Sequence, residues 1–185
     1  LQGGPHLNTI AGIAVALKEA SKSSFKTYAK KIVQNAKVLA EELKGFGFDL
    51  VSGGTDSHLL LIDLRNKNVL GNTAAEGLEE ANIIVNRNAV PFDPNPPFYP
   101  SGIRLGTPGI TSRGMGVREM RKIARFINDV IESLSEAKKL LGINDLQERK
   151  TSVRREIIAS ASKVISRVKK EVLNLCRAFP LKKVY

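Results

Sequence analysis

Phe48-Asp-Leu-Val-Ser-Gly-Gly-Thr-Asp-Ser-His-Leu-Leu-Leu-Ile-Asp-Leu64 is the segment in which the sequence pattern changes from helical to extended. Phe48–Val51 is short and rich in β-prone residues, Ser52–Asp56 has the composition of a turn, and His58–Leu64 is an apolar run bounded by that turn. The segment therefore predicts two β-strands. Because helical patterns lie on both sides of it, these strands must pack against helices.

Two helices are predicted before these strands. Gly3–Pro5 is a cluster of helix breakers, and apolar residues then recur at helical spacing over Leu7–Ala20. A second apolar face indicates a helix that is N-capped by Ser23 or Ser24 and closed at Gly45.

Short elements are predicted after the strands. Asn72 or Thr73 is expected to cap a short helix, and Ile83–Val85 is expected to form a third, brief strand. Asn86–Pro100 contains five prolines and three asparagines, so we expect an ordered loop without a regular element. Ser101–Leu105 then predicts a small strand.

Two long amphipathic helices are predicted toward the C-terminus. The first begins at Val117, after a helix entry at Thr111–Gly114, and the second covers Val153–Cys176. Gly142–Lys150 is interpreted as a polar linker between them. Helices that flank a few short strands in mixed order predict an α/β or α+β fold.

Composition narrows the class of protein. The 185 residues are 42% hydrophobic and 25% charged, which fits globular domains and excludes collagen, a disordered tail and a coiled-coil rod. A lone cysteine, Cys176, suits a reducing compartment, and we expect a cytoplasmic location.

The longest apolar stretch, Ile10–Leu17, is shorter than the roughly 20 residues that span a bilayer. Because the chain also opens without a basic n-region, we expect neither a signal peptide nor a membrane anchor. The opening Leu1–Pro5 resembles the middle of a loop, so we expect a piece of a longer polypeptide.

The net charge of +11 is unevenly distributed. Residues 1–112 contain 11 Lys/Arg and 10 Asp/Glu, whereas residues 113–185 contain 18 and 8. This asymmetry raises an alternative function, a non-catalytic basic helical module that binds nucleic acid or a partner protein. Interspersed acids and the scarcity of aromatic residues in this region argue against nucleic acid.

Three polar segments are candidate sites. Gln2–His6 precedes a helix, where glycine amides and the helix dipole suit a phosphate, although the spacing alone favours a plain turn with a cap. Arg104 lies within a short apolar strand between glycines, where it needs either a ligand carboxylate or an internal acid. The asparagines of Asn86–Pro91 could bind a heteroaromatic ligand, or they could form hydrogen bonds with their own backbone. His58 at a strand start favours a structural role, and two histidines and one cysteine without ligand spacing argue against a metal site.

Taken together and in this order, several segments resemble serine hydroxymethyltransferase. They are Gln2-Gly-Gly-Pro-His6 with Thr9–Ala20, Val51-Ser-Gly-Gly-Thr-Asp-Ser-His58, Asn86-Arg-Asn-Ala-Val-Pro91, and Ser101-Gly-Ile-Arg-Leu-Gly-Thr-Pro108 with Thr111–Gly114. The resemblance covers residues 1 to about 135. It implies the end of a fold-type I pyridoxal-phosphate large domain in residues 1–22. Residues 23–185 would then be a small α/β domain, with a short, mainly antiparallel sheet packed against helices and a divergent basic helical extension from about residue 136.

The resemblance also implies an activity. Members of this family transfer the hydroxymethyl group of serine to tetrahydrofolate with pyridoxal 5′-phosphate as cofactor, giving glycine and 5,10-methylenetetrahydrofolate, and they form a homodimer or a dimer of dimers. The chain looks like the C-terminal half of such an enzyme. It lacks the Thr-His-Lys segment that carries the Schiff-base lysine, so we expect no catalytic residue here and no activity of the chain alone. A catalytically silent partner built from the same half remains a further alternative.

Roles for individual residues are likewise implied by the resemblance. Gly3 and Gly4 would offer backbone amides to the cofactor phosphate of a neighbouring subunit. Arg104 would bind the substrate carboxylate, and Asn88 would contact the folate pterin. Pro96, Pro97 and Phe98 lie where the family often has Ser-Pro-Phe near folate, and Pro96 removes the serine hydroxyl.

Overall fold

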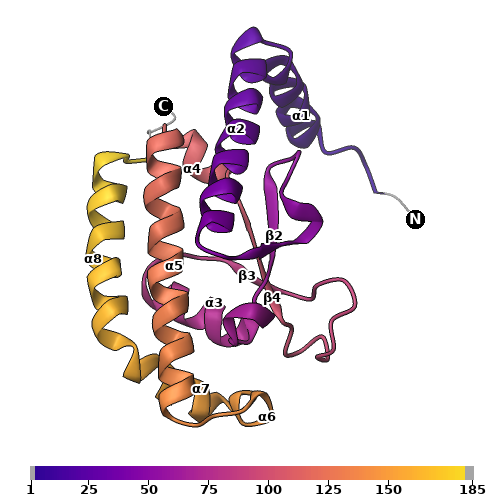
Figure 1. Ribbon diagram of the computed structural model, residues 1–185. Helices are drawn as coiled ribbons and strands as arrows, with labels where there is room; N and C mark the ends of the chain where they lie inside the picture. The colour runs from indigo at the N-terminus through magenta and orange to yellow at the C-terminus, as the bar shows by residue number, and fades with distance from the viewer. Residues whose placement is uncertain (1–2, 182–185) are drawn as a thin grey trace.

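A computed structural model describes residues 3–181 as one sheet with helices packed against it (Figure 1). The four strands are antiparallel in the order β1-β2-β4-β3, where β1 is Asp49–Leu50, β2 Leu59–Asp63, β3 Asn86–Asn88 and β4 Gly102–Gly106. The longer helices are α1 (Leu7–Ala20), α2 (Ser23–Gly45), α3 (Gly71–Glu80), α5 (Val117–Leu140), α7 (Thr151–Ser160) and α8 (Ser162–Ala178). This architecture confirms the predicted mixed α/β class.

The first two helices follow the prediction closely. α1 has the predicted bounds, and α2 ends at Gly45, before a left-handed turn at Gly47 with φ 77°. The predicted serine cap is wrong, because Ser23 is already the first helical residue. Lys22 is the N-cap, and its carbonyl accepts the Phe25 N–H at 3.1 Å.

The third strand lies three residues later than predicted. Ile83–Val85 is not a strand, because the Ile83 N–H bonds to the Leu78 carbonyl and closes α3. Instead Asn86–Asn88 pairs with β4, Asn86 opposite Arg104 and Asn88 opposite Gly102. The expectation of a loop from Asn86 onward was therefore wrong for its first three residues, which precede the prolines and keep N–H groups for pairing.

Helix starts in the middle of the chain also differ from the prediction. α3 is preceded by Leu70, and neither Asn72 nor Thr73 caps it. Thr111–Gly114 is not a helix entry, because it begins inside a short helix, α4 (Pro108–Ser112). α5, by contrast, starts at Val117 as predicted, after Gly116, whose N–H donates to the Glu119 carboxylate at 2.9 Å.

The C-terminal region contains more elements than predicted. The expected single helix over Val153–Cys176 is broken at Ala161, which has φ −85° and ψ 0° and separates α7 from α8. The expected polar linker contains a short helix, α6 (Asp145–Glu148), and Glu148 is completely buried. None of the described helices is long and apolar enough to cross a bilayer.

The sheet buries one face and leaves the other open. Leu60, Ile62 and Ile103 are at most 1% exposed and belong to the hydrophobic core with residues of α2, α3, α5, α7 and α8. Their neighbours along the strands, Leu59 and Arg104, are exposed. Because side chains alternate across a strand, these exposed residues lie on the opposite face of the sheet.

Candidate functional site

The candidate site is a groove beside the open face of the sheet. Its volume is ≈ 960 Å³, and we call it the sheet groove. One side is formed by α2 and the turn at Val51–Ser57, and the sheet side includes Asn88 and Arg104. The strand pairing explains this proximity, because β3 and β4 are adjacent and Asn86 lies directly opposite Arg104. The structure thus brings together two candidate residues 16 positions apart in the sequence.

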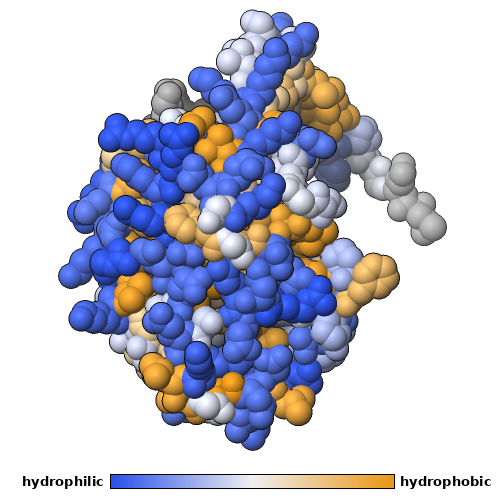
Figure 2. Space-filling view, viewed as in Figure 1, coloured by the Kyte–Doolittle hydropathy of each residue, from blue (hydrophilic) through white to orange (hydrophobic). Residues whose placement is uncertain are grey.

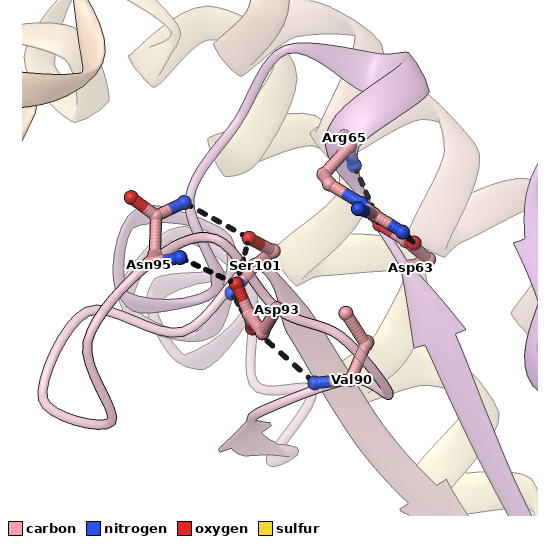
Figure 3. Close-up of polar contacts among 6 residues, drawn as sticks. All are labelled: Asp63, Arg65, Val90, Asp93, Asn95 and Ser101. Carbon is pink, nitrogen blue, oxygen red and sulfur yellow. Dashed lines mark hydrogen bonds and ion pairs between the residues drawn. The ribbon is translucent and has the colours of Figure 1, made fainter.

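Arg104 is the most distinctive side chain of the groove. Among the described residues it has no recorded hydrogen bond or ion pair, although it lies opposite Leu61 on an apolar strand. Asp63, two residues farther along β2, is bound by Arg65, whose Nε lies 2.8 Å from Asp63 Oδ2 (Figure 3). That pair raises the pKa of Arg65 through the hydrogen bond and the charge of Asp63. The internal acid that could explain Arg104 structurally is therefore not in contact with it.

The Asn88 side chain is partly satisfied by the backbone of the next residue. Its Nδ2 donates to the Ala89 carbonyl at 2.8 Å, which is the local bonding expected for a loop asparagine. Asn88 Oδ1 has no recorded donor among the described residues. The carbonyl oxygen is thus the part of this side chain that remains able to accept a hydrogen bond from a ligand.

Asp93 organises the Pro-rich loop, by which we mean residues 89–101 between β3 and β4 (Figure 3). Its Oδ1 accepts the Ser101 hydroxyl at 2.6 Å and the Asn95 N–H at 3.0 Å, and its Oδ2 accepts the Ser101 and Val90 N–H groups. Burial alone would raise the pKa of Asp93, but these hydrogen bonds outweigh it and lower the pKa below its ordinary value. The loop is therefore ordered around an ionised carboxylate.

The remaining candidate residues lie outside the sheet groove. Pro96, Pro97 and Phe98 are exposed in the Pro-rich loop and do not line the groove. Gly3 and Gly4 are exposed before α1, on a segment that leads away from the sheet (Figure 1). The structure therefore unites Arg104 with Asn88 and leaves the other candidates at separate positions.

Three contributors to this region were not identified from the sequence. Lys37 on α2 and Asp56 in the turn before β2 line the groove and form an exposed ion pair at 3.5 Å. Nothing in their local sequence indicates that pairing. Asp93 could have been found from the sequence, because an aspartate in a loop often accepts the N–H two residues later in an Asx turn. Here that N–H belongs to Asn95.

The glycine segment can be tested for compatibility with a phosphate. A Cβ built on Gly3 or Gly4 meets no atom within 4 Å, and neither glycine has a positive φ. Neither N–H is recorded as donating to another described group. The segment therefore has free amides in open space, which fits an anion supplied from outside this chain.

Comparison with known proteins identifies a family. The sequence model of the serine hydroxymethyltransferase family matches residues 1–127. A protein of Acidothermus cellulolyticus named serine hydroxymethyltransferase is 60% identical over 135 residues, which cover 73% of this chain and 32% of that protein. A Sorangium cellulosum protein of the same name is 44% identical over 180 residues, which cover 97% of this chain and 37% of that protein. The chain thus spans about a third of the length of these relatives.

Proposed function

The chain belongs to the serine hydroxymethyltransferase family, and from this premise we propose that it is the C-terminal portion of an enzyme that transfers the hydroxymethyl group of serine to tetrahydrofolate. The products would be glycine and 5,10-methylenetetrahydrofolate. We place the whole enzyme in the cytoplasm as a homodimer or a dimer of dimers. The role of this portion is to bind and orient substrates, and the Schiff-base lysine would lie elsewhere in the enzyme.

The observation that carries the proposal is the unpaired Arg104. A guanidinium offers two parallel N–H groups that match a carboxylate, and such a contact fixes the orientation of an amino acid as well as its position. Arg104 would bind the carboxylate of serine or glycine from the open face of the sheet. Holding the carboxylate restricts rotation of the bound amino acid, which lowers the entropic part of the barrier.

The folate and cofactor contacts are assigned to three segments. Asn88 would accept a hydrogen bond from the pterin through Oδ1, and Pro96, Pro97 and Phe98 would provide apolar contacts to the folate. The amides of Gly3 and Gly4 would bind the phosphate of pyridoxal 5′-phosphate in a neighbouring subunit. When bound, pyridoxal phosphate supplies an electron sink for the bond that is broken.

The distribution of apolar surface supports a larger assembly. α1 has no buried residue, and Leu7, Ile10, Ile13, Val15 and Leu17 are 52–72% exposed. Figure 2 shows apolar surface at the upper right, where Figure 1 places α1. We assign residues 1–22 to the end of the large domain and residues 23–185 to the small domain. The exposed face of α1 would then pack against the rest of the large domain.

Substitution of Arg104 tests the proposal. In the whole enzyme we expect Arg104→Ala to weaken serine and glycine binding at least 100-fold, which corresponds to about 3 kcal/mol. Arg104→Lys should not restore it, because a lysine lacks the planar fork. Titration calorimetry with glycine gives the affinity, and cofactor absorbance serves as the control that should stay unchanged. Wild-type serine affinity in Arg104→Ala would refute the assignment.

The basic-module alternative has less support. Residues 113–185 contain 18 lysines and arginines, and in the part that the structure describes, up to residue 181, seven of them are engaged by carboxylates, amides or backbone carbonyls. They are Arg113, Arg121, Arg125, Lys138, Arg149, Arg154 and Arg167. Arg113, for example, donates to the carbonyls of Cys176 and Phe179 at the end of α8. These seven basic side chains therefore join parts of the fold.

A further inference from the structure

Arg149 connects the C-terminal region to the Pro-rich loop. It lies outside the segment matched by the family model, directly after α6. Its Nη2 donates to Asn95 Oδ1 at 2.8 Å, and its guanidinium carbon lies 5.7 Å from the centre of the Tyr99 ring. The contact joins residues 54 positions apart and combines a hydrogen bond with a cation–π interaction.

The backbone that carries Arg149 is firmly held. Its carbonyl accepts Arg154 Nη1 at 2.8 Å, and Arg154, only 6% exposed, binds both carboxylate oxygens of Glu76 on α3. The preceding residue, Glu148, is buried against Lys138 with 2.6 Å between the charged atoms. Arg149 therefore extends from a rigid base toward the loop.

The middle of the Pro-rich loop has little other support. Residues 95–99 bond within the loop through the Tyr99 N–H to the Pro96 carbonyl at 2.8 Å and through Asn95 to Asp93 and Ser101. Among the described residues, Arg149 makes the one recorded hydrogen bond from this stretch to another element. Phe98 at the loop tip is 78% exposed, so packing does not hold it.

We propose that Arg149 is a positioning residue for folate. It would act through Asn95 and Tyr99 to hold the Pro96–Phe98 turn in the conformation that receives the co-substrate. The inference rests on the proposed function for the identity of the ligand, but the contact itself belongs to this chain. Its loss should raise the entropic cost of ordering the loop on binding, so affinity for folate should fall while the affinity for serine stays unchanged.

Two measurements on matched variants test the inference. Arg149→Ala removes the contact from one side, and Asn95→Ala removes it from the other together with the Asn95–Ser101 bond. Arg149→Lys keeps the charge, and Arg155→Ala is the control, because Arg155 is exposed on α7 and no bond of its side chain is found among the described residues. Hydrogen exchange of residues 91–100 in this chain should accelerate about tenfold in both alanine variants, less in Arg149→Lys, and not in Arg155→Ala. Asn95→Ala keeps the test decisive if Arg149→Ala does not fold.

The second measurement is kinetic and uses the whole enzyme. The KM for tetrahydrofolate should rise fivefold or more in both alanine variants, while kcat and the KM for serine change less than twofold. Unchanged hydrogen exchange, or faster exchange with an unchanged folate KM, would overturn the positioning role. A wild-type enzyme without tetrahydrofolate-dependent transfer would instead overturn the proposed function, and with it the folate part of this inference.

Discussion

At the scale of single residues, Asp93 orders the Pro-rich loop, which contains the proposed folate contacts. We expect Asp93→Asn to lower the free energy of unfolding at pH 7, because an amide cannot accept all four of the hydrogen bonds described above. The pKa of Asp93 is lowered in the folded state, so its stabilisation is complete above the unfolded pKa of about 3.9 and is lost as pH falls below it.

The difference in the free energy of unfolding between the wild type and Asp93→Asn should therefore become smaller below pH 4. Urea unfolding between pH 7 and pH 3 measures it, and Asp56→Asn, whose side chain is fully exposed, is the control. A difference that stays constant over this range would show that ionisation of Asp93 does not order the loop.

Single residues also show what the sequence could predict about the site. Arg104 could be identified, because an arginine in a short apolar strand between glycines conflicts with burial. The sequence could not show whether an internal acid pairs with Arg104, because the acid on the neighbouring strand, Asp63, is bound by Arg65 instead. The proximity of Asn88 to Arg104 required the strand order, which local pattern does not specify.

At the scale of elements, prediction succeeded where a periodic pattern had clear boundaries. α1 and β2 have such patterns, and both lie within one residue of the predicted bounds. β3 is polar and short, so it forms only because β4 offers it a partner. The start of α3 could not be predicted, because the Leu70 N–H bonds to Glu148, 78 residues away.

Glu148 is therefore expected to stabilise two elements at once. Its Oε1 accepts the Leu70 N–H at 2.9 Å, and its Oε2 lies 2.6 Å from Lys138 Nζ on α5. Glu148→Gln keeps an acceptor for the amide but removes the charge from a fully buried pair, and we expect a loss of about 3 kcal/mol. Thermal and urea unfolding measure this loss of stability. Glu136→Gln is the control, because Glu136 is exposed on α5, the helix that carries Lys138. Lys138 Nζ also lies 2.5 Å from Asp145 Oδ1, so a loss equal to that of the control would mean that Asp145 alone satisfies Lys138.

At the scale of the whole molecule, we expect this chain alone not to catalyse serine hydroxymethyl transfer. No Thr-His-Lys sequence is present, and Lys37, a lysine that lines the sheet groove, is ion-paired with Asp56. Incubation with pyridoxal phosphate, borohydride reduction and mass spectrometry should find no stoichiometric lysine adduct, and a serine turnover assay should find no product. A stoichiometric adduct on this chain would contradict the expectation.

The lack of buried residues in α1 has a consequence for how the molecule assembles. An isolated helix of 14 residues is only marginally stable in water, because nucleation is unfavourable and each added residue contributes little. No residue of α1 is buried, so packing within the described chain adds little to its stability. Its helix–coil equilibrium would therefore depend on a surface that covers its apolar side. If α1 docks on the rest of the proposed large domain, part of the free energy of docking would be used to complete this helix, which would weaken the affinity of α1 for that domain. Folding of α1 and ordering of the adjacent glycine segment would occur together, as one cooperative step linked to assembly.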